Sequence, residues 1–257
     1  MVPWVMLSTA LVFTLAATPA WLLLKEPVTE RASQAVFPVW LNLRRTFSEL
    51  GRDFSEFRLL LLCIVCYQAG IAVVITLAAV YAEQVMGFSM TETIALIVAV
   101  NVTAALGALC FGYAQDRLGH RRALAIALIG WLITSVTAYA ALNAAVFWCA
   151  ACLAGVCMGV TQSAGRAMVG AFAPYDRLSR FFGLWSVSTQ LAAAIGPLTY
   201  GIVTWVTGGD QRLAMLSTSM FFLLALLILK NISWTRGQAQ RQAALNPVSE
   251  QNTIWRM

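Results

Sequence analysis

Charge is scarce in this sequence, and its scarcity excludes an ordinary soluble domain. Only 11% of the 257 residues are charged, whereas 60% are hydrophobic, and the mean hydropathy is +0.75. Soluble domains usually carry about 25% charged residues. A soluble core of this length could not bury so much apolar side chain, so lipid must be the solvent for much of the chain.

Histidine is almost absent, and this removes several classes of enzyme. The single histidine, His120, lies in a basic loop, and the sequence has neither an HExxH motif nor a glycine-rich phosphate loop. All six cysteines lie within apolar runs, where we expect packing residues rather than metal ligands or disulfides; they are Cys63, Cys66, Cys110, Cys149, Cys152 and Cys157. We therefore expect a protein that is not an enzyme, binds no metal and needs no cofactor.

Long apolar runs are what the chain has in abundance. Seven of them approach the roughly 20 residues that cross a bilayer as a helix, and none alternates with the period of a membrane barrel strand. The sequence predicts an all-α membrane protein with seven transmembrane helices, the first of which lacks the basic start of a signal peptide. The spans are Trp4–Leu24, Leu59–Ala82, Thr93–Ala114, Ala123–Leu142, Val146–Ala173, Phe181–Val206 and Leu213–Ile232.

The net charge of +6 comes mostly from arginines in every second connection between spans. Basic residues cluster after the first, third and fifth spans and in the tail, whereas residues 83–92 and 143–145 have none and residues 207–212 have one. Basic loops face the cytoplasm. We expect the N-terminus outside and the C-terminus inside, with a bacterial inner membrane as the location and no nucleic acid as partner.

Four segments follow from this pattern. Residues 1–24 form the first helix, and residues 25–58 form a cytoplasmic loop that is either a plain linker or holds a short amphipathic helix around Trp40–Leu50. Residues 59–232 contain the last six helices. Residues 233–257 form a cytoplasmic tail rich in Gln, Arg and Asn, which we expect to be disordered.

The most specific string is FGYAQDRLGHRRAL, between the third and fourth spans. One glycine would allow close helix packing and the other a tight turn. An acidic–basic pair at the membrane edge can hold two helices together in one state and release them in another. The residues at these positions are Gly112, Asp116, Arg117, Gly119, Arg121 and Arg122.

This string resembles the loop signature G-x-x-x-D-R-x-G-x-[RK]-[RK] of the major facilitator superfamily, although Ala114 and Gln115 depart from the more common Leu-Ala. The signature lies between the second and third helices of each six-helix half. In that register, residues 59–232 correspond to the C-terminal half and the first span to helix six of a twelve-helix transporter. The resemblance implies transport of a small solute by alternating access.

Two further strings resemble the vacuolar amino-acid effluxer-like branch, which is known from autophagy in fungi. They are GVCMGVTQSAGRAMVGAFAP, from Gly155, and FFGLWSVSTQLAAAIGPLTYG, from Phe181. Gln162 and Arg166 match the branch. Three positions depart from it, because Gly165 and Ala167 replace serines and Gln190 replaces a common lysine. This resemblance implies a small solute, with amino acids as a candidate class.

Polar residues inside the spans are the candidate functional residues. Arg166 is costly in lipid, so we expect it to serve the gate or the solute, with Asp116 as partner, unless its side chain extends to the membrane surface. Gly196 and Pro197 predict a kink that marks a moving element. Four amides could line a solute cavity or instead join helices by hydrogen bonds; they are Gln68, Asn101, Gln162 and Gln190.

Completeness is the main alternative that remains open. One half alone has no opposing wall for alternating access, so the chain could be a truncated or remnant protein without transport, or a half that pairs with a separate N-terminal half or with itself. A start at Met1 directly before a span favours a fragment. Asp116-Arg117 after the third span also fits a seven-helix receptor, but the first inside loop is too long for that class.

Overall fold

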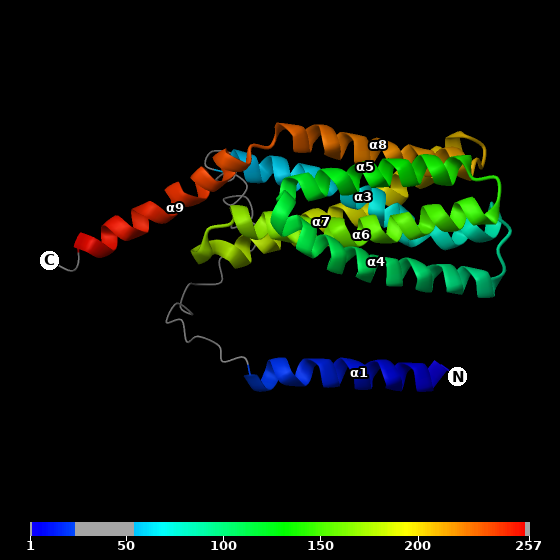
Figure 1. The fold of residues 1–257 in the computed structure, drawn as a ribbon, viewed down its shortest axis with the longest axis horizontal. Helices are drawn as coiled ribbons and strands as arrows, with labels where there is room; N and C mark the ends of the chain where they lie inside the picture. Colours follow the sequence, from blue (N-terminus) through cyan, green and yellow to red (C-terminus); the bar gives the residue numbers. More distant parts are fainter. Residues whose placement is uncertain (1, 24–53, 255–257) are drawn as a thin grey trace. The chain divides into compact units, whose positions relative to one another are not determined.

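The computed structural model describes residues 2–23 and 54–254, and within them the chain is helical without strands (Figure 1). The chain divides into two units, Met1–Thr46 and Phe47–Met257, which are taken separately. The first contains α1 (Val2–Leu23). The second contains α3 (Ser55–Gln84), α4 (Met90–Leu118), α5 (His120–Ala140), α6 (Ala144–Phe172), the short helix η1 (Tyr175–Arg177), α7 (Leu178–Val206), α8 (Gln211–Asn231) and α9 (Trp234–Ile254).

Six helices, α3 to α8, are long and apolar enough to cross a membrane, which confirms the predicted all-α membrane protein. They have 21 to 30 residues, and at about 1.5 Å per residue each can span the roughly 30 Å of hydrocarbon. In α1, the apolar stretch covers Met6–Pro19 of the residues whose side chains are described. The helix α3 begins at Ser55, earlier than the predicted Leu59. The loop helix considered at Trp40–Leu50 lies outside the described residues.

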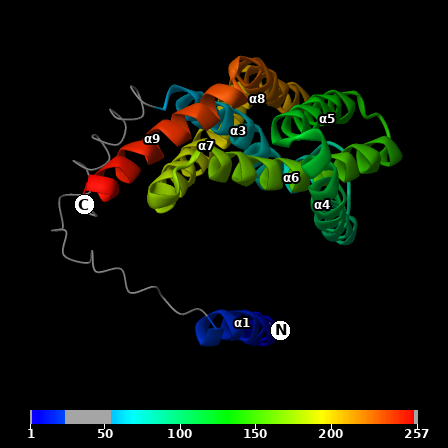
Figure 2. The ribbon, with the colours of Figure 1, turned by 60° about the vertical axis from the view of Figure 1, so that its left-hand side comes forward.

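The helices α3 to α8, called the six-helix unit, pack in pairs that do not follow chain order. The helix α3 packs against α7 and α8, α5 packs against α6 and α8, and α4 packs mainly against α6 (Figures 1 and 2). Because the chain alternates direction, α3, α5 and α7 begin at one end of the unit, where α4, α6 and α8 finish. We call this the basic end, since it carries Arg117, Arg121, Arg122 and Arg177; the other is the opposite end.

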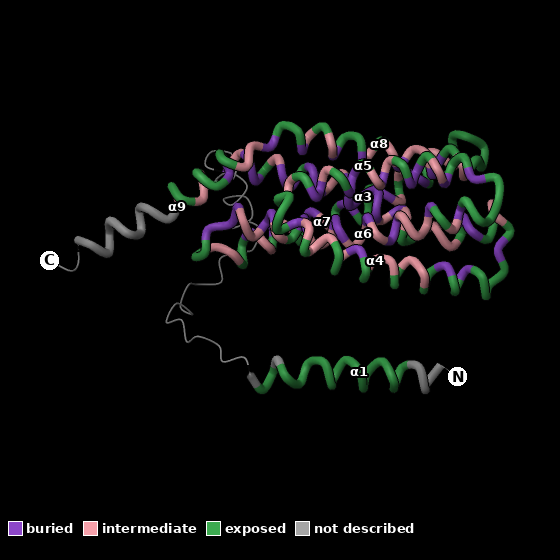
Figure 3. Tube along the Cα trace, viewed as in Figure 1, coloured by how far each residue is buried: buried purple, intermediate pink, exposed green. Residues whose placement is uncertain are grey.

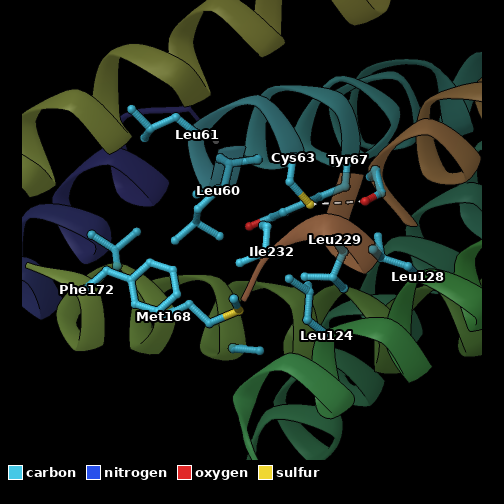
Figure 4. Close-up of a cluster of buried hydrophobic side chains, with 14 of the residues drawn as sticks. Leu60, Leu61, Cys63, Tyr67, Leu124, Leu128, Met168, Phe172, Leu229 and Ile232 are labelled. Carbon is cyan, nitrogen blue, oxygen red and sulfur yellow. Dashed lines mark hydrogen bonds between the residues drawn. The ribbon is translucent and has the colours of Figure 1, made fainter. Parts of the chain in front are cut away.

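The core of the unit falls into two clusters. The larger one lies between α3, α5, α6 and α8 toward the basic end. Figure 4 shows part of it: Leu60 and Leu61 of α3, Leu124 and Leu128 of α5, Met168 and Phe172 of α6, and Leu229 beside Ile232. The smaller cluster surrounds Tyr81 and Phe147 at the opposite end. Along α4 and α7 most side chains are exposed instead (Figure 3).

Glycines allow α4 and α6 to approach closely. A Cβ on Gly107 would meet the backbone of Val156, and a Cβ on Gly159 would meet the backbone of Ala104. The pattern is typical of membrane helices, in which close packing replaces the hydrophobic drive that water provides. This seam holds α4 to the unit, because α4 has few other contacts.

The expectation that the tail is disordered was wrong for residues 234–254, which form α9. Ser233 donates its backbone N–H to the Glu56 carboxylate at 2.7 Å, and Gln240 donates to the hydroxyl of Ser55 at 2.9 Å. The ring of Trp234 lies 5.3 Å from that of Phe172. The polar composition of the tail favours disorder locally, but contacts to α3 and α6 stabilise the helix instead.

Candidate functional site

A single residue joins α4 to α5 in the predicted loop signature. Gly119 has φ +84°, and it ends α4 and begins α5 at once. Its N–H donates to the carbonyl of Gln115 at 2.9 Å, while its carbonyl accepts from Ala123 at 3.1 Å. A residue with a Cβ is strained at this φ. The glycine predicted to permit a tight turn therefore stands where the turn requires it.

An open cleft of about 750 Å³ lies beside this turn at the basic end. His120 Nδ1 lies 2.6 Å from the side-chain nitrogen of Gln115, and Arg121 donates to the backbone carbonyl of Lys230 at 2.9 Å. Arg122, Asp116 and Trp234 also line the cleft. The arginine contact ties α5 to the last turn of α8, where the free carbonyls carry partial negative charge.

Among the described residues, the other signature residues make no side-chain contact with a neighbouring helix that would close a gate. Arg117 contacts Tyr113 of its own helix, with a hydrogen bond of 2.6 Å to the hydroxyl and its guanidinium 4.7 Å from the ring centre. Asp116 is exposed. Apart from the nearby backbone of α4 itself, no described atom lies within 4 Å of the position of a Cβ on Gly112, so the close packing expected at Gly112 remains a prediction.

Arg166 lies near the basic end of α6 and contacts α7. Its guanidinium lies 5.3 Å from the ring centre of Trp185, which is a cation–π contact. Among the described residues no ion pair joins Arg166 to Asp116, so the structure does not bring these two predicted partners together. Arg166 itself is exposed. A solute or another protein surface could therefore reach its charge.

Two of the four predicted amides meet between α3 and α6. The side-chain nitrogen of Gln162 donates to the amide oxygen of Gln68 at 3.4 Å. Gln68 is buried and Gln162 is partly buried. Gln162 and Arg166 are four residues apart, so they share one face of α6. This places an amide pair one helical turn from a cation.

The other two amides lie apart from this pair. Asn101 of α4 is exposed and donates to the carbonyl of Ile97 in its own helix at 2.8 Å. Gln190 of α7 is also exposed. Among the described residues neither is hydrogen-bonded to Gln68 or Gln162, so a cavity shared by all four remains a prediction.

The helix α7 runs from Leu178 to Val206 with Pro197 inside it, and the kink expected at Gly196 and Pro197 remains a prediction. A Cβ on Gly196 would meet the backbone of Ala69 in α3. Gly196 therefore lets α3 and α7 approach closely in this conformation, and the moving element remains a prediction.

Several contacts near these residues were not foreseen from the sequence. Position 165 faces the hydroxyl of Tyr67, which leaves no room for a serine side chain there. Trp185 contacts Arg166. The sequence could not predict this contact, because the two residues lie on different helices. No group of His, Cys, Asp or Glu among the described residues could hold a metal ion, and all six cysteines are free thiols.

Two comparisons identify similar proteins. The model of a family described as vacuole effluxer Atg22 like matches residues 1–242 of the chain. An uncharacterized MFS-type transporter, YqjV of Bacillus subtilis (strain 168), is 23% identical over 120 residues. That alignment covers 47% of this chain and 29% of the relative. The chain therefore matches less than a third of the relative's length.

Proposed function

Because the chain belongs to the vacuole effluxer Atg22-like family, we propose that it is the C-terminal half of a secondary transporter of the major facilitator type. It moves a small solute by alternating access, and amino acids are the class to test first. Family membership and the similarity to an MFS-type transporter support a membrane transporter over the seven-helix receptor. The solute and the mechanism are the proposal.

The amide pair beside an arginine carries this proposal. Gln68 and Gln162 present donors and acceptors between two long apolar helices. Arg166 lies one turn away on the same face of α6. A guanidinium binds a carboxylate through two parallel hydrogen bonds, and amides suit a neutral or zwitterionic remainder. Together they provide the recognition groups for a small molecule with a carboxylate.

The signature loop serves as the gate at the basic end. Arg121 ties α5 to α8, whereas Asp116 and Arg117 are exposed at the end of α4. Exposed charges at a helix end can pair with a surface that approaches in only one state. We assign Asp116 and Arg117 to such a contact across the cytoplasmic side of the transporter.

Alternating access requires a second six-helix half to close the site. The exposed charge of Arg166 on a membrane-length helix supports such a half, because an arginine facing lipid is costly. The opposing half belongs to the same polypeptide, to a separate N-terminal half or to a second copy of this chain. The alternative is a remnant without transport.

The size of the native polypeptide separates these cases. We would tag the C-terminus at its own locus and blot membranes beside the 27.9 kDa chain made alone. A band about twice as large would mean that the second half belongs to the same polypeptide. A band that matches the control would make a partner chain or a remnant the only choices, and crosslinking of that band would decide between them.

Orientation is tested in the same strain. The positive-inside pattern supports our proposal that the basic end and the C-terminus face the cytoplasm, with a bacterial inner membrane as the location. A C-terminal alkaline phosphatase fusion should then be inactive and a green fluorescent protein fusion should be bright. The reverse result would overturn the proposed orientation and the cytoplasmic gate with it.

Solute transport is tested with a matched pair of variants in the complete assembly. We expect Gln162→Ala and Arg166→Gln to abolish most of the flux of labelled amino acids in membrane vesicles. Thr161→Val is the control. Thr161 is the buried residue directly before Gln162, and its hydroxyl donates within its own helix, at 2.9 Å to the carbonyl of Cys157. Normal flux in Gln162→Ala would remove that residue from the site, and no flux in the parent would favour the remnant.

A further inference from the structure

A second cavity lies toward the opposite end of the six-helix unit, away from the amide pair. It has a volume of about 250 Å³ and is bounded by α3, α4, α5, α6 and Met215 of α8. Alanines on α3, α5 and α6 line this space, and larger side chains at these positions would fill it. Neither Gln68 nor Gln162 nor Arg166 lines the cavity. We call it the α5 crevice.

One face of α5 forms the floor of the crevice. Trp131, Thr134, Ser135 and Ala138 all line it, and their spacing of three or four residues puts them on one side of the helix. The mouth lies between α3 and α4, where Ile75 and Ile97 are 63% and 48% exposed. The crevice therefore has a buried floor and an accessible entrance.

Two polar groups on the floor have no hydrogen-bond partner among the described residues. They are the indole nitrogen of Trp131 and the hydroxyl of Thr134. Trp131 is 0% exposed and Thr134 is 5% exposed. Buried tryptophans normally satisfy their N–H, and an unsatisfied buried donor destabilises the fold. Such groups point to something that occupies the crevice.

The hydroxyl of Thr134 is unusual in comparison with its neighbours. Ser135 donates to the carbonyl of Trp131 at 3.0 Å, and Thr218 of α8 donates to the carbonyl of Met215 at 2.7 Å. These are the ordinary contacts of a hydroxyl in a membrane helix. Thr134 makes no such contact among the described residues, so its buried hydroxyl on this face of α5 lacks the partner that its neighbours have.

The lining defines the chemistry of the occupant. Among the described residues around the crevice none is charged, and most are aliphatic or aromatic. An apolar cavity of about 150 Å³ holds benzene, so about 250 Å³ holds a ring with a polar substituent. The indole N–H can only donate. The occupant must therefore present a hydrogen-bond acceptor and carry no charge.

We propose that the α5 crevice binds a small uncharged molecule with an aromatic or branched apolar body and an acceptor oxygen, through Trp131 and Thr134. A lipid acyl chain would pack against the apolar walls, but it would leave the N–H of Trp131 and the hydroxyl of Thr134 without a hydrogen-bond partner. The site is separate from the amide pair, and it does not depend on whether the chain transports a solute.

Two isosteric probes test this on the purified full chain in detergent. 4-Fluoroacetophenone has an acceptor oxygen where 4-fluoro-α-methylstyrene has a methylene group. Binding is followed by fluorine NMR, with empty micelles subtracted. We expect the ketone to bind roughly tenfold more tightly, as one or two buried hydrogen bonds imply. Equal affinities would overturn the proposal and assign the crevice to hydrocarbon chains.

Variants locate the binding. Trp131→Phe and Thr134→Val should each reduce the preference for the ketone by roughly threefold or more, while Thr161→Val, away from the crevice, should leave it unchanged. Ala151→Leu should abolish binding by filling the space, and Ala78→Leu on the other wall repeats this test if the first variant fails to fold. Ketone binding that survives both filling variants would place it elsewhere and overturn the proposal.

Discussion

The two ends of the six-helix unit differ in the hydrogen bonds that stabilise them. At the basic end, residues far apart in sequence are joined by polar contacts, such as Ser233 to Glu56 at 2.7 Å and Arg241 to the Ala171 carbonyl at 3.1 Å. At the opposite end, local caps begin the helices, with Ser89, Asn143 and Asp210 each accepting a backbone N–H three residues later. The opposite end also has tertiary polar contacts, such as that of Tyr81 to the Ala138 carbonyl at 3.1 Å, but its helix starts are capped locally and it keeps room for the α5 crevice.

This difference indicates where each end can change shape. Caps satisfy each helix separately, so helices at the opposite end can separate without losing them. Contacts between distant segments at the basic end must break together when the helices part. We therefore expect substitutions at the basic end to cost more than similar ones at the opposite end.

Removal of the Glu56 carboxylate should give the largest effect. Glu56 is 3% exposed, and it accepts from the N–H of Ser233 and lies 3.7 Å from Arg236. Glu56→Ala should lower the free energy of unfolding by about 2–3 kcal/mol, as expected for buried bonds to a charged group. It should also release α9, which limited trypsin digestion at Arg241 would detect.

The matched control is Gln84→Ala at the opposite end. Gln84 is exposed and hydrogen-bonded to Gln211 of α8, so its loss should change stability by less than about 0.5 kcal/mol. Unfolding in a denaturing detergent titration measures both. If α9 stayed protected from trypsin in Glu56→Ala, the contact of Trp234 with Phe172 rather than the carboxylate would hold the helix.

The next largest difference in stability between the two ends should come from side-chain packing. Gly165 faces the hydroxyl of buried Tyr67, so Gly165→Ser should destabilise the unit by about 2 kcal/mol through overpacking. Tyr67→Phe removes the clashing oxygen and should recover at least half of that loss in the double variant. Ala151→Ser, in the crevice, should be nearly neutral. Additive effects of the two substitutions would show that the hydroxyl is not the obstacle.

The turn between α4 and α5 should be more sensitive than the loop between α3 and α4. Both contain a glycine at positive φ, Gly119 at +84° and Gly87 at +70°. Gly119 is the only residue between its helices, so Gly119→Ala should cost about 1–2 kcal/mol. Gly87 lies in a longer loop that can adjust, and Gly87→Ala should cost less. Equal losses in melting experiments would argue against this rigidity.

Hydropathy predicted the spans because the physics is local. A run of about 20 apolar residues must become a helix to satisfy its backbone in lipid, and α4 to α8 begin and end within a few residues of their predicted bounds. The Gly119 turn was predictable for a similar reason, since only a few residues determine it. The helix α9 was not, because its contacts come from Ser55, Glu56 and Phe172, far away in the sequence.

The candidate site was predictable as residue types but not as an arrangement. Polar residues within apolar runs identified Gln68, Gln162 and Arg166. The sequence could not show that the two amides meet at 3.4 Å or that Arg166 lies over Trp185. The crevice is a property of empty space, and the alanines that create it look like ordinary membrane-helix residues. Which hydroxyls find partners depends on packing across helices.

The smallest effect should be a gain in stability at the crevice. Thr134→Val removes a buried hydroxyl that has no partner among the described residues and keeps the side-chain shape. Without a bound molecule it should raise the free energy of unfolding by up to about 1 kcal/mol. Thr161→Val removes a hydroxyl that donates at 2.9 Å, so it should lower stability by a similar amount. Opposite signs for two buried Thr→Val changes would distinguish the unsatisfied floor from the satisfied core. A loss in both would mean that the Thr134 hydroxyl already has a partner in the folded protein, and the case for an acceptor ligand would rest on Trp131 alone.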